Sequence, residues 1–439
     1  MTKDLLNQLN AGKFPIELPG HFIGGQWGFS GAPNILESRC PSTDGLLASS
    51  NASKSDIKTA INCAFEHHIS DQAHDFKKRI AKLASFSELF KKHSSELLKA
   101  ATREQGKPLW EVMHDIKATE DYLDWVCTSG DFIKDQLLGP ARLGHLHGDL
   151  RQKPAGPIAA YLPFSTTIQS FTFYYVGAVL SNCPVIMFSS KHNLVQASLL
   201  ANLVDNSMKQ FECQAGAFHM ILAGFSEFKM ALSDRRISAV LYTGSRDHCD
   251  EIREDSSSFP ERRLILQSGG KNTAIIDEAA DMKLAVNAIF QGAFKSGGQL
   301  CSSTNRVAIH QSKYDEFKSL CLKALKQMKI GPTYNSDHNP FMGPLFSAKA
   351  VERFLRFQTM AAREAEETIS WGKAYTPEED GTSAGNYVKP GIHLMKKIDD
   401  TPYQNSVIVC PDIAVYKFAN LESGIKNTGL KRENKTITP

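Results

Sequence analysis

Paired cysteines are lacking in this 439-residue chain. Its nine cysteines include no C-x-x-C pair and lie far apart, at positions 40, 63, 127, 183, 213, 249, 301, 321 and 410. An odd number of widely separated cysteines without such a pair indicates neither a zinc ribbon nor a disulfide framework. We therefore expect reduced thiols and no metal site.

Long apolar runs and basic tracts are lacking as well. No stretch of about 18 apolar residues is present, which argues against a membrane span. The N-terminal segment MTKDLLNQLNAGKFPIELPG carries charges and a proline where an export signal needs an apolar core. The 50 basic and 47 acidic residues give a net charge of +3, and no basic tract is interleaved with aromatic residues. We expect a cytoplasmic protein with neither a nucleic-acid nor a membrane partner.

The composition is that of an ordinary globular protein, and the first third of the chain has helical patterns. Hydrophobic residues make up 42% and charged residues 22%. The length predicts two or more domains. Ser53-x-x-Asp56 is typical of a helix start, and apolar residues then repeat along one helical face. A second helix is predicted from Phe76 through Leu97, with a stop at residues 106–108, GKP.

From Pro157 onward, short apolar runs alternate with helical stretches. Runs of this length without strict alternation are typical of strands buried on both faces. The pattern predicts an α/β fold with one or two doubly wound parallel sheets. Residues 141–153 contain the turn signal His147-Gly148-Asp149 and predict a hairpin, and residues 374–386 predict an exposed loop. The predicted strands are 158–162, 184–188, 219–222, 237–242, 264–266, 274–276 and 306–309.

Cys301 has the most informative setting among the cysteines. It follows the segment SGGQL and precedes SST. Glycines before a thiol allow close approach of a substrate and present N–H groups to a developing oxyanion. A single cysteine in a chain of this length is more often a small core residue. The spacing alone leaves both interpretations open.

Several motifs in register with one another resemble the NAD(P)-dependent aldehyde dehydrogenases. Residues 298–301, GQLC, resemble the G-Q-x-C nucleophile motif of that family. Residues 266–272, LQSGGKN, resemble its E-L-G-G-K-N segment, residues 242–245, YTGS, its F-T-G-S segment, and residues 104–108, EQGKP, its E-T-G-K-P segment. The similarity extends over residues 21–430, and the succinylglutamate-semialdehyde branch is the most similar.

The resemblance implies a fold, a reaction and a division of the chain. It implies two Rossmann-like domains: cofactor-binding residues 1–140 and 154–242, and catalytic residues 243–430, with 141–153 as an oligomerisation hairpin. In such enzymes a Cys thiolate attacks an aldehyde, hydride passes to NAD or NADP, and water hydrolyses the resulting thioester. Cys301 matches the nucleophile, and a small-molecule aldehyde is the implied substrate.

Two positions that assist the nucleophile in the family carry different residues here. Gln267 stands where the family has its general base, a Glu, and an amide cannot accept the proton of a water. Ser165 stands where the family has an Asn that donates to the oxyanion, and a hydroxyl has a shorter reach than an amide. Packed polar residues without a role are the alternative interpretation of both.

The cofactor positions are altered in a similar way. In the family's F-K-P-S-E motif the Lys and Glu contact the adenosine ribose, and this chain has Ser189 and His192 there, with Lys191 close by. Gly224 matches one glycine of the pyrophosphate turn, and the second glycine is absent. Val407 replaces the Glu that holds the nicotinamide ribose. Thr243, Gly244 and Ser245 are also candidate cofactor-binding residues, and Ser245 is the best preserved of these contacts.

The end of the chain departs from the family pattern. Residues 427–430, NTGL, resemble an N-x-T-x-x-G-L region, whereas residues 431–439, KRENKTITP, have no counterpart. The family's following residues complete the catalytic domain and supply a strand that pairs with a neighbouring subunit. We expect a truncated chain with an aberrant tail, and a weakened homo-oligomer. The polar tail is typical of a premature stop or a frame change.

Three functions stay open at this point. The first is an aldehyde dehydrogenase with impaired turnover, and the second is a degenerate relative that serves as a binding or structural protein. The third is a cofactor-independent thiol esterase. Losses of about 10² in each of two helpers would remove about 5 kcal/mol of transition-state stabilisation. That magnitude favours weak or absent dehydrogenase turnover.

Overall fold

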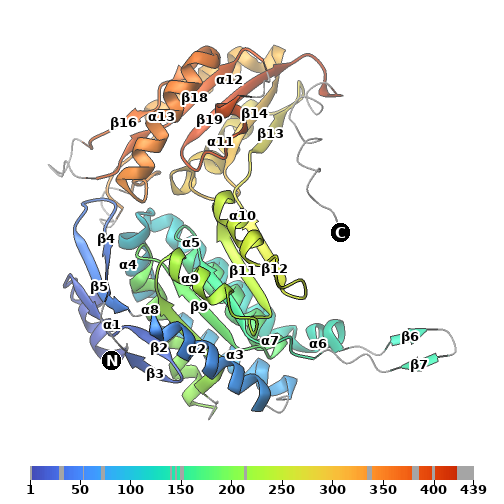
Figure 1. Cartoon of the computed structure of the whole chain (residues 1–439). Helices are drawn as coiled ribbons and strands as arrows, with labels where there is room; N and C mark the ends of the chain where they lie inside the picture. Colours follow the sequence, from blue (N-terminus) through green and yellow to red (C-terminus); the bar gives the residue numbers. More distant parts are fainter. Residues whose placement is uncertain are drawn as a thin grey trace. The chain divides into compact units, whose positions relative to one another are not determined.

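A computed structural model gives the fold (Figure 1). The chain divides into two compact units. Unit 1 contains Met1–Arg39, Leu46–Gln105 and Val112–Ser268, and unit 2 contains Cys40–Gly45, Gly106–Glu111 and Gly269–Pro439. The structure describes residues 2–28, 34–52, 54–70, 75–138, 141–143, 146–148, 153–211, 215–333, 339–377, 385–397 and 401–422.

Unit 1 is built on a seven-stranded sheet whose first five strands are parallel. The chain runs outward from β8 through β9 to β10, then returns to the other side of β8 with β11 and β12. The order therefore reverses between β8 and β11, which makes the carboxyl ends of these strands the place for a ligand crevice. The order is β12 (Arg263–Ser268), β11 (Ala239–Gly244), β8 (Ile158–Leu162), β9 (Val185–Ser189), β10 (Phe218–Leu222), β2 (His21–Ile23) and β3 (Gln26–Gly28).

Helices cover both faces of this sheet because its strands are apolar on both faces. Ala160 and Met187 belong to one buried cluster, whereas Ala159 and Ile186 belong to another on the opposite face. The predicted doubly wound arrangement is confirmed. The predicted helix 76–97 is in fact two helices that meet at His93. The helices are α1 (Thr2–Asn10), α2 (Ser55–Ser70), α3 (Phe76–Lys92), α4 (Ser94–Gln105), α5 (Leu109–Thr128), α6 (Gly130–Leu138), α7 (Thr167–Ser181), α8 (Leu194–Lys209), α9 (Phe225–Leu232) and α10 (Arg246–Asp255), with a 3-10 turn at Ala215–Ala217.

Unit 1 also holds two smaller sheets. One is three-stranded, with the order β1 (Ile16–Leu18), β5 (Leu46–Ala52) and β4 (Asn34–Arg39). The other is a hairpin of β6 (Ala141–Leu143) and β7 (Leu146–Gly148). The hairpin was predicted, but its turn was placed wrongly. His147 pairs with Arg142 inside the ladder, so the predicted turn residues His147 and Gly148 belong to strand β7.

Unit 2 contains a second sheet, parallel except for its edge strand β15. Alternate residues of β19 again enter different clusters: Val415 packs with Val307 of β14 on one face, and Ala414 and Tyr416 pack on the other. The order is β13 (Asn272–Ile276), β14 (Thr304–His310), β19 (Asp412–Phe418), β18 (Gly391–Met395) and β15 (Ala365–Ser370). The other elements are α11 (Met282–Phe294), α12 (Tyr314–Gln327), α13 (Ala348–Glu364), α14 (Pro402–Asn405), β16 (Lys373–Ala374), β17 (Val388–Lys389) and 3-10 turns at Lys295–Gly298 and Gln311–Lys313.

The division between the units differs from the predicted boundary after residue 242. β11 continues to Gly244, and β12 pairs with it in the same sheet, so unit 1 extends to Ser268. Part of the predicted loop 374–386 and the predicted tail 431–439 lie outside the described residues. Within the described part of the chain, no helix is long and apolar enough to cross a bilayer.

His219 on β10 makes the stability of unit 1 depend on pH. Its side chain is fully buried, its Nδ1 accepts from the N–H of Gly24 at 3.2 Å, and its Nε2 lies 3.0 Å from the carbonyl oxygen of Gly216. Both contacts are satisfied by the neutral ring with its proton on Nε2. Burial lowers the pKa of His219 from 6.5 to about 4, and the nearby His67 contributes in the same direction. The unfolded chain therefore binds a proton in this range that the folded chain does not.

We expect the free energy of unfolding to fall as the pH falls from about 6.5 to about 4, since the depressed pKa favours protonation of the unfolded state there. The shift corresponds to about 2 kcal/mol between pH 7 and pH 5. Urea unfolding at both pH values measures it. His219→Gln should show a correspondingly smaller loss between pH 7 and pH 5. Replacement of the exposed His114 by Gln should retain the loss seen in the parent, and an equal loss in all three proteins would contradict the assignment.

Candidate active site

In unit 2, the segment before Cys301 is a tight left-handed turn. Ser296, Gly297 and Gly298 have φ values of 54°, 61° and 67°. A Cβ atom at position 298 would lie 2.4 Å from the carbonyl oxygen of Cys410. Glycine is therefore required there by both conformation and space. The turn comes directly after α11 and leads the chain into the exposed residue Cys301.

Two amide side chains fix the backbone around this turn. Gln299 donates to the carbonyl oxygen of Ser296 at 2.8 Å and accepts from the N–H of Phe346 at 3.0 Å. Asn272 donates to the carbonyl oxygens of Cys301 and Ser303, both at 2.9 Å. The N–H of Cys301 itself donates to no acceptor in the part of the chain that the structure describes. That N–H remains able to donate to an oxyanion.

Cys301 also differs from the other cysteines in accessibility. Among the cysteines that the structure describes, it is the one that is exposed. Burial raises the pKa of the thiols of Cys63, Cys127, Cys249 and Cys321, and raises that of Cys410 well above its ordinary value. A thiolate is the reactive form, so a raised pKa lowers the reactivity of these thiols at neutral pH. The predicted nucleophile is the described thiol best placed to react.

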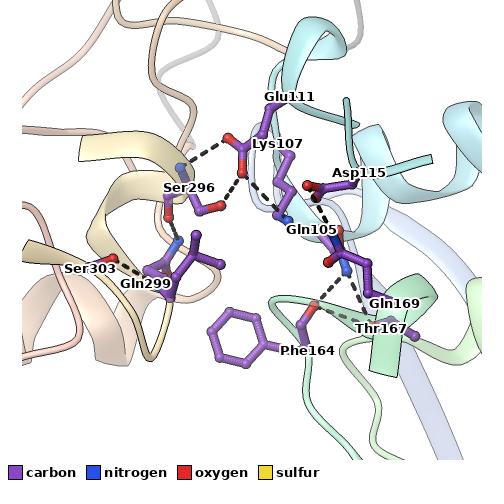
Figure 2. Close-up of polar contacts among 11 residues, drawn as sticks. Gln105, Lys107, Glu111, Asp115, Phe164, Thr167, Gln169, Ser296, Gln299 and Ser303 are labelled. Atoms are coloured by element: carbon purple, nitrogen blue, oxygen red, sulfur yellow. Dashed lines mark hydrogen bonds and ion pairs between the residues drawn. The ribbon is translucent and has the colours of Figure 1, made fainter. Parts of the chain in front are cut away.

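Polar contacts of the buried residue Glu111 hold the same turn. Glu111 lies in the first turn of α5 and accepts hydrogen bonds from both the N–H and the hydroxyl of Ser296 (Figure 2). The ammonium of Lys107 lies 3.5 Å from the carboxylate. This cluster belongs wholly to unit 2.

Val407 and Lys271 lie in the same unit. A Cβ atom on Gly269 would come within 2.9 Å of Val407, so the valine packs closely against the glycine pair that follows β12. Lys271 is buried, and its ammonium donates to the carbonyl oxygen of Tyr403 at 3.1 Å. Burial lowers the pKa of Lys271 to about 8. These contacts order the segment but provide no ribose-binding group at Val407.

The remaining predicted site residues gather at the carboxyl edge of the sheet in unit 1. Ser165 follows β8, Ser189 ends β9, Gly224 follows β10, and Thr243 pairs in register with Gln267 on β12. Ser165 is half-buried and Gln267 is exposed. The structure thus brings these residues to one edge, as the topology of a doubly wound sheet requires.

The turn that carries Ser165 is held by buried amides. Gln105 donates to the carbonyl oxygen of Phe164 at 2.7 Å, and Asn193 donates to the hydroxyl of Thr167 at 3.2 Å (Figure 2 shows the first). Thr167 in turn donates to the carbonyl oxygen of Pro163 at 2.9 Å. The position of the Ser165 backbone is therefore well determined.

Comparisons with known proteins agree with this geometry. Residues 29–428 match the model of the aldehyde dehydrogenase family. This chain belongs to the aldehyde dehydrogenase family. It is 26% identical over 411 residues to N-succinylglutamate 5-semialdehyde dehydrogenase of Ectopseudomonas mendocina (strain ymp), covering 92% of this chain and 80% of that protein. The family predicted from the motifs is confirmed, and a protein of the succinylglutamate-semialdehyde branch is among its relatives.

Solved structures give the same fold. Aldehyde dehydrogenase from Bartonella henselae matches with a TM-score of 0.85 at 19% identity, over 94% of this chain and 85% of that one. Betaine aldehyde dehydrogenase from Staphylococcus aureus, in complex with NAD+, matches with a TM-score of 0.86 at 18% identity, over 97% and 81%. The predicted fold class is therefore confirmed.

NAD or NADP is the cofactor that fits the aldehyde dehydrogenase family, but one of the two predicted ribose contacts is occupied by the protein itself. Ser189 is fully buried, and its hydroxyl donates to the side chain of Asn193 at 2.9 Å. His192 is half-buried, and burial, with a smaller contribution from Lys191, lowers its pKa to about 4. A neutral ring provides no charge for a phosphate. The hydroxyl of Ser189 is thus bonded within the protein, whereas the neutral ring of His192 can offer a ribose a hydrogen bond but no charge.

The residues at the predicted phosphate-binding positions fit a dinucleotide through their main-chain N–H groups rather than through their side chains. Gly224 caps α9, and Ser245 caps α10 by accepting from the N–H of His248 at 3.3 Å. The first N–H groups of a helix fit a phosphate. The Glu227 carboxylate lies 3.0 Å from where a Cβ of Gly224 would be, and this negative charge opposes an anion. The fit to a dinucleotide is therefore confined to the backbone.

Aromatic rings fill the space between the starts of α9 and α10. The rings of Phe225 and His248 stack with centroids 3.6 Å apart and an interplanar angle of 11°. Tyr242 contacts Nδ1 of His248 through its hydroxyl at 2.8 Å, and the hydroxyl lies 2.2 Å from where a Cβ of Gly244 would be. Thr243 shares a hydrogen bond of 2.9 Å with Tyr174. The best preserved motif therefore also serves internal packing.

Three residues that the sequence did not single out are central to the site. Glu111, Asn272 and Gln299 hold the turn and the backbone of Cys301. Asn272 and Gln299 lie inside quoted motifs, so their motif positions were a signal for them. Glu111 lies 185 positions from Ser296, and no local pattern links the two residues.

Proposed function

We propose that this aldehyde dehydrogenase family member oxidises an aldehyde to a carboxylic acid through Cys301, with NAD or NADP as hydride acceptor and at a low rate. The observation that carries the proposal is the exposed thiol of Cys301 on a glycine-rich turn whose backbone is held by Asn272 and Gln299. Unit 1 takes the cofactor-binding role and unit 2 the catalytic role. The hairpin β6–β7 takes the oligomerisation role.

The reaction begins at the thiol. The sulfur of Cys301 forms a bond with the aldehyde carbon, and the electron pair of the C=O bond moves to oxygen. The unpaired N–H of Cys301 donates to that oxyanion, since it has no acceptor among the described residues. When bound, the nicotinamide supplies a hydride acceptor, and the backbone at Gly224 and Ser245 would hold its phosphates. Loss of hydride from the thiohemiacetal to that acceptor would leave a thioester on Cys301, and water would cleave it to release the acid and the free thiol.

The low rate follows from the groups that surround this step. Gln267 can orient a water but cannot take its proton, and a general base typically contributes about 10²–10⁴-fold. Ser189 and Val407 offer no ribose contact, so we also propose weak cofactor binding. The chain is similar to an N-succinylglutamate 5-semialdehyde dehydrogenase, so that aldehyde is the first substrate to try.

The test combines turnover with binding. The purified chain is mixed with the aldehyde and with NAD or NADP, and the absorbance of the reduced cofactor is followed while calorimetry measures nucleotide binding. Slow aldehyde-dependent growth of absorbance supports the proposal. Nucleotide-independent hydrolysis of an activated ester, without any oxidation, would instead favour a thiol esterase. Neither activity, together with no nucleotide binding, would favour a non-catalytic relative.

Ser165→Asn is expected to increase the rate of turnover. The longer amide donor is expected to raise turnover by up to about 10²-fold, because lost oxyanion donors cost about 10²–10³-fold. Stability should change little, since the turn is held by Gln105 and Asn193 rather than by the side chain of Ser165. Steady-state kcat measures the gain. Thr166→Asn, one residue on, is the matched control, and an equal gain there would contradict the role of position 165.

A further inference from the structure

The buried carboxylate of Glu111 accepts hydrogen bonds from the turn that precedes Cys301. Glu111 has no exposed surface and Lys107 has 4%. One carboxylate oxygen accepts from the N–H of Ser296 at 2.9 Å, and the other accepts from its hydroxyl (Figure 2). The ammonium of Lys107 is 3.5 Å away, from a residue four positions earlier that precedes α5. Ser296 therefore bonds to the carboxylate through both its main chain and its side chain.

The backbone conformation of Ser296 indicates why its hydrogen bonds to Glu111 matter. Its φ of 54° is in the left-handed region, where a residue with a Cβ costs roughly 1–2 kcal/mol relative to the right-handed one. Glycine would relieve that cost, as it does at the next two positions. A serine offers what glycine lacks, a hydroxyl that reaches the carboxylate of Glu111. The two hydrogen bonds hold the turn in its left-handed form.

From Ser296 the turn leads to the reacting residue in five positions. Gln299, two places before Cys301, donates to the carbonyl oxygen of Ser296. The hydrogen bonds that fix Ser296 therefore also constrain Gln299. Gly298 packs on the backbone of Cys410, which leaves the turn little freedom to adjust. A shift at Ser296 would therefore move the N–H of Cys301, the group that faces the oxyanion.

We infer that Glu111 is a positioning residue for Cys301, acting through Ser296 to aim the N–H of Cys301 at the developing oxyanion. The inference rests on the proposed function only in taking Cys301 as the reacting thiol. Glu111 touches no reacting atom, and Lys107 balances its charge. The pair therefore fixes geometry and leaves the turn without a net charge from the carboxylate.

Two reactions of the Cys301 thiol distinguish the orientation of its N–H group from the accessibility of its sulfur. Acylation of Cys301 by p-nitrophenyl acetate passes through an oxyanion, whereas alkylation by iodoacetamide does not. Neither reaction needs an aldehyde or a nucleotide. The rate of each is measured on the full-length chain, by the p-nitrophenol burst and by mass spectrometry of the peptide that contains Cys301.

In Glu111→Gln we expect acylation to slow about tenfold and alkylation to change less than about twofold. Ser296→Ala should lower the ratio of acylation to alkylation in the same direction. Ser296→Gly keeps the left-handed turn accessible but lacks the hydroxyl, and Glu111→Asp keeps the negative charge on a shorter side chain. The ratio of acylation to alkylation in both should lie between that of the parent and that of Glu111→Gln. Glu367→Gln is the matched control, because Glu367 also pairs with a lysine and a hydroxyl in unit 2, and its ratio should equal that of the parent.

Equal slowing of both reactions would indicate general loosening of unit 2 and would overturn the inference. An unchanged ratio in both Glu111→Gln and Ser296→Ala would overturn it too, as would a parent chain whose Cys301 is alkylated but never acylated. If Glu111→Gln does not fold, the two Ser296 variants decide the outcome. A parent chain that acylates but oxidises no aldehyde would remove the proposed function and leave this inference intact.

Discussion

Replacing Cys301 by Ala is expected to reduce aldehyde-dependent formation of reduced cofactor to the uncatalysed background. Loss of a nucleophile in a covalent mechanism costs about 10⁶-fold in turnover, because the remaining groups have no bond-forming atom to assist. The side chain is exposed, so the substitution leaves no cavity and should not lower the free energy of unfolding measurably. Nucleotide affinity should also be unchanged, since the proposed cofactor contacts lie in unit 1.

The matched control is Cys127→Ala, which removes a half-buried thiol whose pKa is raised by burial. It should retain the parent rate of turnover. The two variants are compared by reduced-cofactor absorbance with the same aldehyde, and their nucleotide binding is compared by calorimetry. Turnover that survives in Cys301→Ala would show that another group reacts with the aldehyde. Turnover lost in both variants would point to a shared loss of folding.

The parallel strands of unit 1 and the strands β13 and β14 of unit 2 could be predicted because each contains a short apolar run, whereas β18 and β19 of unit 2 were not predicted. The runs at 158–162 and 306–309 became β8 and β14, since apolar residues on both faces suit strands covered by helices on each side. The edge strand β15, AEETIS, was missed because one face of an edge strand is polar and the segment carries no continuous apolar run. The register of the hairpin also differs from the prediction, because His147 and Gly148, which were predicted in the turn, pair with Arg142 and Ala141 in the ladder.

The site was predictable only where its residues share one motif. Cys301 and its glycines could be recognised because the turn is local, and each glycine has a conformational reason to be there. Glu111 could not be predicted from its own surroundings, because its role depends on a contact with Ser296 that only the tertiary fold creates. The fate of Ser189 was equally hidden, since its hydroxyl is taken by Asn193 inside unit 1. Motif positions therefore identify a scaffold more securely than they identify free functional groups.

Gln267→Glu is expected to raise aldehyde oxidation by about 10²-fold, and by up to about 10⁴-fold if hydrolysis of the thioester is fully limiting. The substitution replaces an amide that cannot accept a proton by a carboxylate that can, at the position where the resembling enzymes carry their general base. Gln267 is exposed at the end of β12, in register with Thr243, so an ionised carboxylate there is solvated. The free energy of unfolding should therefore stay within about 0.5 kcal/mol of that of the parent.

The pH profile and a neighbouring variant identify the cause of such a gain. A general base acts when ionised, so the added activity should rise as the pH rises through the pKa of the new carboxylate, near 4.3 for a solvated Glu. Ser268→Glu adds the same charge one residue later, where alternation along β12 directs the side chain to the other face of the sheet, and it should give no gain. Equal gains in both variants would assign the effect to net charge. An unchanged rate in Gln267→Glu, in a chain that oxidises aldehyde detectably, would mean that a step other than proton removal from water limits this enzyme.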